Sequence, residues 1–275
     1  MIRFKPLRVD RYHHNTPILS DREIDEFAHA VLKDYRPELL LKPGKIDYLH
    51  FLENYLGMRI ECLDIYNENP KRPVLAMTSF NEDMFYVFDK ENNTIKPVTV
   101  PANTVVLDNI LFKPGKEKIA LFTGMHEGGH KIFHWHIFKH LHEFEESGYE
   151  SDEEITSSLV CCRREYIENF GSSKQIRKAA EWREHHADYF ASAATMPNAT
   201  FRPYVNGLLR ANGYYKGMIT LGRDGYLDIL ADDIIPEAIS DVYGVSKRAA
   251  RIKLRKTGFV DSVSDNSKEQ VEFIV

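Results

Sequence analysis

A chain of 275 residues is long enough to bury a substantial hydrophobic core, and its 43% apolar and 28% charged residues are typical of globular rather than disordered or membrane-spanning proteins. The net charge of -5 gives no general reason to expect nucleic-acid binding, although a local basic patch remains compatible with it. Three cysteines, two of them the adjacent Cys161 and Cys162, do not make a disulfide framework. Because the sequence also lacks a secretory signal and a long apolar run, we expect a soluble cytoplasmic protein with no membrane partner.

The N-terminal part of the chain has the signals of two helices. Ser20 and Glu23 form a capping box that opens an amphipathic helix, which Pro37 ends. Its apolar residues recur at helical spacing, at Ile24, Phe27, Ala28, Val31 and Leu32. A second helix is predicted from about residue 46 to 56, stopping at Gly57. We therefore predict an N-terminal helical lobe over residues 18–70.

The next segment changes to short β-branched and aromatic runs. Strands are predicted between residues 58 and 107, mainly antiparallel, with a hairpin turn in the DKENN sequence. Helices are then predicted from the KPGKEK sequence to about Glu146, from Ser151 or Asp152 to Asn169, and from about Ser173 to Met196. Cys161 and Cys162 would be packing residues on the second of these helices. These elements define a predicted α+β core over residues 71–200, followed by a helical segment over 201–258 and a tail over 259–275.

The sequence FTGMHEGGHKIFHWH contains two histidines four residues apart. On a helix, His126 and His130 would project from the same face, so that both rings can reach one metal ion. Glu127 would lie about 100° around the helix, where it can reach a water on that ion rather than the ion itself. The spacing indicates a metal-binding pair with an adjacent general base.

A catalytic zinc usually has three protein ligands, so a third is needed elsewhere. The best candidate is Glu184 in the sequence EWREHHADYFASAATMP. Asp188 follows it by one helical turn, which would allow Glu184 to bind the metal while Asp188 accepts an imidazole N–H. Small residues at Ala187, Ala191 and Ala194 would let the two helices approach closely enough to share an ion.

These two motifs together resemble the ImmA/IrrE family of intracellular zinc metallopeptidases. The family pattern is an H-E-x-G-H helix followed by E-x-x-A-[DN]-x-F-A and a Met-Pro, and the likeness extends from about Ser20 to Phe259. The resemblance implies a zincin-like fold, zinc on His126, His130 and Glu184, and Glu127 as the general base. It also implies cleavage of a regulatory protein, often a helix-turn-helix repressor. Gly128 departs from the pattern, since the family usually carries a larger side chain there.

Other histidines near the motif are expected to have lesser roles. His134 extends the same helix face by another turn. At that distance, packing against a helix or hydrogen bonding to a metal-binding residue is commoner than metal binding itself. His136 is expected to take no part in the chemistry. His185 and His186 are expected to be surface residues, with substrate or oxyanion contact as the alternative.

A second hypothesis, DNA binding, comes from the sequence IPEAISDVYGVSKRAARIKLRK. It resembles a helix-turn-helix with a basic second helix, whose cations are Lys247, Arg248, Arg251, Lys253, Arg255 and Lys256. A charge run is more often a solvated face, so we expect protein docking or packing ahead of DNA binding. The first hypothesis is therefore a zinc endopeptidase that hydrolyses peptide bonds in a regulatory protein, a helix-turn-helix repressor or antitoxin-like partner. The alternative is a DNA- or partner-binding regulatory protein with a structural or relic zinc site.

Overall fold

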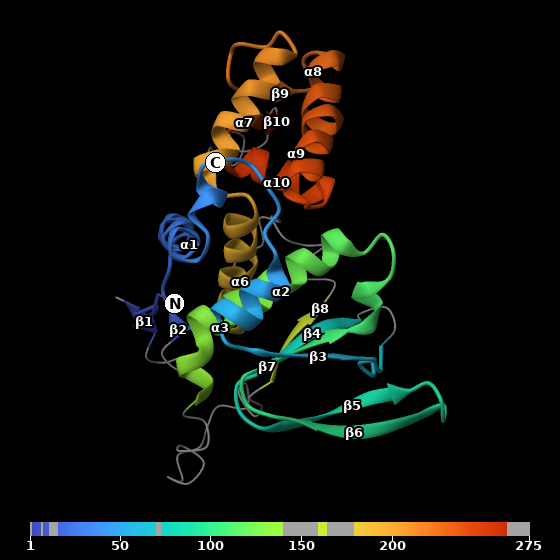
Figure 1. Cartoon of the computed structure of the whole chain (residues 1–275). Coiled ribbons are helices and arrows are strands. Elements are labelled where there is room, and N and C mark those ends of the chain that lie inside the picture. Colours follow the sequence, from blue (N-terminus) through green and yellow to red (C-terminus); the bar gives the residue numbers. More distant parts are fainter. Residues whose placement is uncertain are drawn as a thin grey trace, which may run out of the picture.

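The computed structural model describes residues 2–6, 8–10, 16–69, 73–139, 159–163 and 179–262. Within these ranges the chain has an α+β fold. The C-terminal helices lie at the top of the view, the other helices in the middle and at the left, and the main sheet and hairpin at the lower right (Figure 1). The helix start predicted at Ser151 or Asp152, and the predicted tail beyond residue 262, lie outside the described residues. No helix in the described part of the chain is both long and apolar enough to cross a bilayer.

The N-terminal helices form where the capping signals predict them. Helix α1 spans Asp21–Tyr35, and its N-cap Ser20 forms the full capping box with Glu23. After the short 3-10 helix η1 (Pro37–Leu40), helix α2 (Tyr48–His50) continues directly into the π-helix η2 (Phe51–Tyr55) and ends before Gly57, whose φ is 65°. Two short strands, β1 (Val9–Asp10) and β2 (Thr16–Pro17), pair ahead of α1.

A four-stranded sheet follows, in the order β3-β7-β4-β8. Its strands are β3 (Arg59–Leu63), β4 (Val74–Ser79), β7 (Thr104–Asp108) and β8 (Leu159–Arg163). The pairs β4–β7 and β4–β8 are antiparallel, whereas β3 runs parallel to β7. Strand β4 is therefore interior, and all six of its residues are buried.

Strands β5 (Asp83–Asp89) and β6 (Thr94–Val100) form the predicted hairpin, which lies beside the main sheet (Figure 1). Phe85 and Val87 face a small apolar cluster beneath the hairpin. Met84 and Tyr86 alternate with them and are each 53% exposed, as the period of two along a strand requires.

Helix α3 (Glu117–Lys139) packs against helix α6 (Ala179–Thr195) at the centre of the molecule. Helix α3 follows the 3-10 helix η3 (Asn109–Phe112) and also contacts β4, so it lies between the sheet and α6 (Figure 1). The predicted helix through Cys161 and Cys162 is wrong at that point. Both cysteines lie in β8, opposite Met77 and Ala76 of β4, because backbone pairing with a neighbouring strand outweighs a local helical pattern.

The C-terminal segment is mostly helical and packs onto the same core. It contains α7 (Asn198–Ala211), β9 (Ile219–Leu221), α8 (Gly225–Ile229), η4 (Leu230–Ile234), α9 (Ile235–Tyr243), α10 (Lys247–Lys256) and β10 (Val260–Ser262). Strands β9 and β10 pair in parallel. Gly244, with a φ of 72°, ends α9 in the left-handed conformation, and Ser246 caps α10. A single hydrophobic cluster extends from Ile24 in α1 to Val260 in β10.

Candidate metal centre

Helix α3 is enclosed by other elements along its central turns. Residues 120–130 are buried without interruption, which is the pattern of a helix packed between layers rather than of a surface helix. A Cβ on Gly129 would lie 2.9 Å from the Cα of Ala187 in α6, and a Cβ on Gly128 would lie 3.1 Å from the ring of Phe51. The two glycines thus let α6 and the N-terminal helices pack directly on the backbone of α3.

Replacing Gly129 with alanine is expected to lower the free energy of unfolding by about 1–3 kcal/mol, because the added methyl meets the backbone of Ala187. Chemical denaturation followed by circular dichroism measures this change. The matched control is Gly207→Ala in α7, where an added Cβ meets no atom within 4 Å and should stabilise the protein by about 0.5–1 kcal/mol. Equal effects at both positions would contradict the close approach of α3 and α6.

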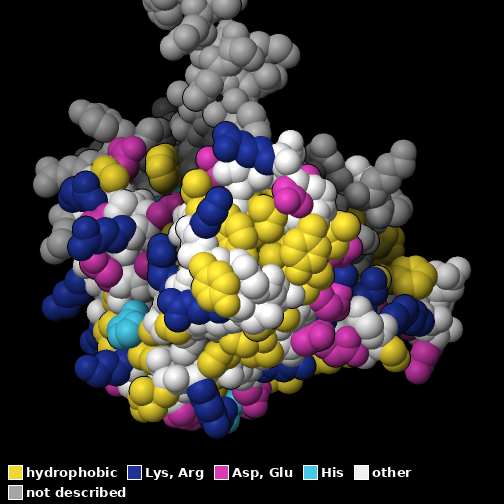
Figure 2. Space-filling view, turned by 90° about the horizontal axis from the view of Figure 1, so that it is seen from above, with side chains coloured by type: hydrophobic (Ala, Val, Ile, Leu, Met, Phe, Trp, Pro, Cys, Tyr) yellow, Lys and Arg dark blue, Asp and Glu magenta, His cyan; other side chains and the backbone are white. Residues whose placement is uncertain are grey.

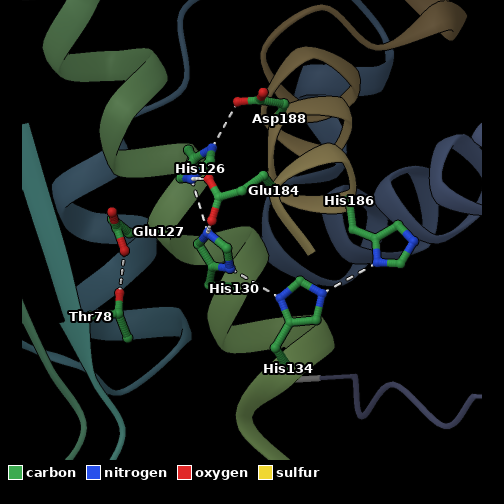
Figure 3. A network of polar contacts seen from close by, with 8 residues as sticks. All are labelled: Thr78, His126, Glu127, His130, His134, Glu184, His186 and Asp188. Carbon is green, nitrogen blue, oxygen red and sulfur yellow. Dashed lines mark hydrogen bonds and ion pairs between the residues drawn. The ribbon is translucent and has the colours of Figure 1, made fainter. Parts of the chain in front are cut away.

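Three side chains from these two helices converge on one point (Figure 3). The Nε2 atoms of His126 and His130 lie 2.9 Å apart. The carboxylate of Glu184 lies 3.4 Å from His126 Nε2 and 3.5 Å from His130 Nε2. All three offer a ligand atom within 4.8 Å of one another, so this group could hold a metal ion.

The hydrogen bonds around His126 direct a lone pair toward that point. Asp188 Oδ1 lies 2.8 Å from His126 Nδ1, and an ionised carboxylate can only accept a hydrogen bond. His126 therefore donates from Nδ1, and Nε2 of its neutral ring carries a lone pair. Two imidazole nitrogens and a carboxylate therefore face one another in this site, and one cation could bind all three.

Burial disfavours charge on these groups when no cation is present. It lowers the pKa of His130 and raises the pKa of Glu184. A positive ion would reverse the effect on Glu184, because it favours the ionised carboxylate. A bound cation would therefore stabilise the form of the site in which Glu184 is ionised and His130 is neutral.

Two further histidines lie behind His130 and, like His126 and His130, have an exposure of 0%. His134 Nδ1 lies 3.0 Å from His130 Nδ1, and His134 Nε2 lies 3.3 Å from His186 Nδ1. The expectation that His186 is a surface residue is wrong, since its exposure is 0%. Burial lowers the pKa of His186 to about 3. His185, by contrast, turns away from the site and binds Asp21 of α1 at 2.8 Å.

Glu127 projects from α3 toward the sheet, beside the converging group (Figure 3). It is completely buried, and its Oε2 accepts a hydrogen bond of 2.5 Å from the hydroxyl of Thr78 in β4. Thr78 is a residue that the sequence does not single out, because a threonine in a strand has no distinguishing local pattern. Its role depends on β4 lying against α3.

Comparison with models of known protein families and with curated proteins finds no match to this chain. The geometry of the converging histidines and carboxylates is therefore what supports a functional conclusion.

Proposed function

We propose that this protein is a zinc-dependent endopeptidase with a zincin-like arrangement of helix α3, helix α6 and the sheet. The observation that carries the proposal is the convergence of His126, His130 and Glu184, with Glu127 held beside them by Thr78. Imidazole nitrogens with one carboxylate are a ligand set that zinc accepts, and three protein ligands leave a fourth position for catalysis. An unrelated structural site would not need a buried carboxylate next to its ligands.

Each residue of the group has a distinct task in peptide hydrolysis. A bound zinc ion would act as a Lewis acid: it would polarise the carbonyl of the scissile peptide bond and lower the pKa of a water molecule to about 7. Glu127 takes a proton from the attacking water at its carboxylate and then gives a proton to the leaving amine nitrogen. Thr78 fixes the orientation of that carboxylate by donating to Oε2. Asp188 holds the ring of His126 with Nε2 facing the metal position.

The class of substrate rests on the family resemblance rather than on a surface of the molecule. We infer a cytoplasmic regulatory protein, such as a helix-turn-helix repressor, as the substrate. In zincins an extended peptide commonly adds to a sheet edge. Strands β4 and β7 are each paired on both sides and cannot accept such a peptide. Among the described residues, the outer strands of the main sheet are β3 and β8.

The proposal is tested by metal analysis of the purified protein together with capture of its substrate. We expect one zinc per chain, and a Glu127→Gln form that retains a partner which the wild type cleaves. Peptide products from that partner should appear with wild-type protein and disappear when a chelator is added. A wild type without zinc, or cleavage that persists in chelator, would overturn the assignment.

The alternative function, DNA binding through α10, has less support from the charges around that helix. Lys253 is buried and lies 3.5 Å from Asp25, and Lys256 lies 3.4 Å from Asp21. Lys247, Arg251 and Arg255 form ion pairs with acidic residues of η4 and α9, namely Asp232, Asp233 and Glu237. At this end of the molecule, Lys and Arg side chains are mixed with Asp and Glu (Figure 2).

Mobility-shift titration is expected to show only weak, non-specific DNA binding, with a dissociation constant above about 1 µM at physiological salt. The reason is that most cations of α10 already face carboxylates of the same chain. The matched comparison is Asp232→Asn with Asp233→Asn, which removes partners of Arg251 and should strengthen the non-specific binding. Nanomolar, sequence-dependent binding by the wild type would favour the alternative function.

A further inference from the structure

The proposed chemistry uses His126 and His130 but gives no task to the two histidines behind them. His134 and His186 have exposures of 0%, and their rings stack with centroids 5.6 Å apart. Hydrogen bonds join them in a chain, from His130 Nδ1 to His134 Nδ1 and from His134 Nε2 to His186 Nδ1 (Figure 3). Burying several imidazoles costs free energy unless their polar atoms are satisfied, so an arrangement of this kind calls for an explanation.

A chain of neutral imidazoles can run in either of two directions. In one direction His186 donates to His134, His134 donates to His130 Nδ1, and the proton of His130 is on Nε2. In the other, His130 donates from Nδ1 to His134, and His134 donates from Nε2 to His186. Each ring carries one proton in both cases, so the two arrangements differ in tautomer and not in charge.

Only the second direction makes His130 a metal ligand. It leaves a lone pair on His130 Nε2, which faces His126 Nε2 at 2.9 Å. In the first direction a proton occupies that space and blocks the metal position. The direction of the hydrogen bonds through His134 and His186 therefore decides whether His130 can bind a metal. Neither His134 nor His186 needs to touch the metal position itself.

We propose that His134 and His186 are positioning residues that hold His130 with its Nε2 lone pair directed at the metal. This inference rests on the proposed metal site. The two metal-binding histidines are then held in different ways. The carboxylate of Asp188 can only accept from His126, whereas the neutral ring of His134 both accepts from His130 and donates to His186. A partner behind a metal-binding histidine typically changes metal affinity by about 10- to 100-fold.

Zinc affinity, measured by competition with a chromophoric chelator, tests the proposal in a series of variants. His134→Leu fills the space without an acceptor and should weaken zinc binding by about 10- to 100-fold. His134→Asn keeps an acceptor oxygen close to the position of Nδ1 and should restore most of the affinity. His186→Leu should weaken binding less than His134→Leu. The double Leu variant should bind no more weakly than His134→Leu alone, because residues acting in series are not additive.

Equal weakening by His134→Leu and His134→Asn would indicate a packing role and overturn the proposal. Wild-type affinity in His134→Leu would also overturn it, while zinc binding and peptidase activity of the wild type would leave the proposed function standing. A wild type that binds no zinc would overturn both.

Nitrogen-15 NMR of the zinc-loaded wild type decides the point if the leucine variants fail to fold. We expect the His130 proton on Nδ1, with a coupling to His134 Nδ1 across the hydrogen bond. A proton on His130 Nε2, or no such coupling, would contradict the proposal.

Discussion

Glu127→Gln is expected to lower kcat by about 100- to 10,000-fold, the range that general acid–base catalysis contributes. A glutamine has nearly the same shape and can still accept the hydrogen bond from Thr78 through its amide oxygen, so the fold should persist. What it cannot do is take a proton from water. Steady-state kinetics on the captured substrate, with zinc content measured on the same samples, separates loss of the base from loss of the metal.

Thr78→Val is the matched control for that measurement. Valine has the shape of threonine but cannot donate to Glu127 Oε2. We expect a smaller loss of kcat than in Glu127→Gln, with unchanged zinc content, because the carboxylate remains but is less well oriented. If Glu127→Gln were as active as wild type, Glu127 would not be the base, whatever the metal content.

Glu184→Gln is expected to weaken zinc binding by at least about 100-fold, because it removes the one carboxylate from the three side chains that could hold a metal ion. The effect can be measured as stability. Wild-type protein should gain about 4 kcal/mol in unfolding free energy when free zinc exceeds its dissociation constant 1,000-fold. At the same zinc concentration, a variant that binds 100-fold more weakly should gain no more than about 1.4 kcal/mol. Without zinc the variant should be no less stable, since burial already raises the pKa of Glu184 and so disfavours its charge.

His185→Gln is the control for this second prediction. His185 is adjacent to Glu184 on α6 but binds Asp21 of α1 instead of facing the metal position. Its replacement should leave the stabilisation by zinc unchanged. A zinc-induced gain in Glu184→Gln equal to that of the wild type would exclude Glu184 as a ligand.

Gly128 and Gly129 are explained partly by the local sequence and partly by the tertiary structure. Two glycines within a helix disfavour it by about 1 kcal/mol each relative to alanine, which predicts a packing reason without naming it. The structure supplies the reason, since a side chain at Gly128 would meet Phe51 of η2 and one at Gly129 would meet Ala187 of α6. Neither neighbour can be identified from the sequence, because both lie more than fifty residues away.

Local sequence determined several of the elements, and it determined which residues share a helix face. The capping box at Ser20, the hairpin of β5 and β6, and the pairs His126–His130 and Glu184–Asp188 depend on spacing within one or two turns, which propensity and periodicity report directly. Only the tertiary structure decided which faces meet. It placed Cys161 and Cys162 in a strand beside β4, brought Thr78 to Glu127, and buried His134 and His186 behind His130. These contacts join segments distant along the chain, and packing of whole elements, rather than any local preference, fixes them.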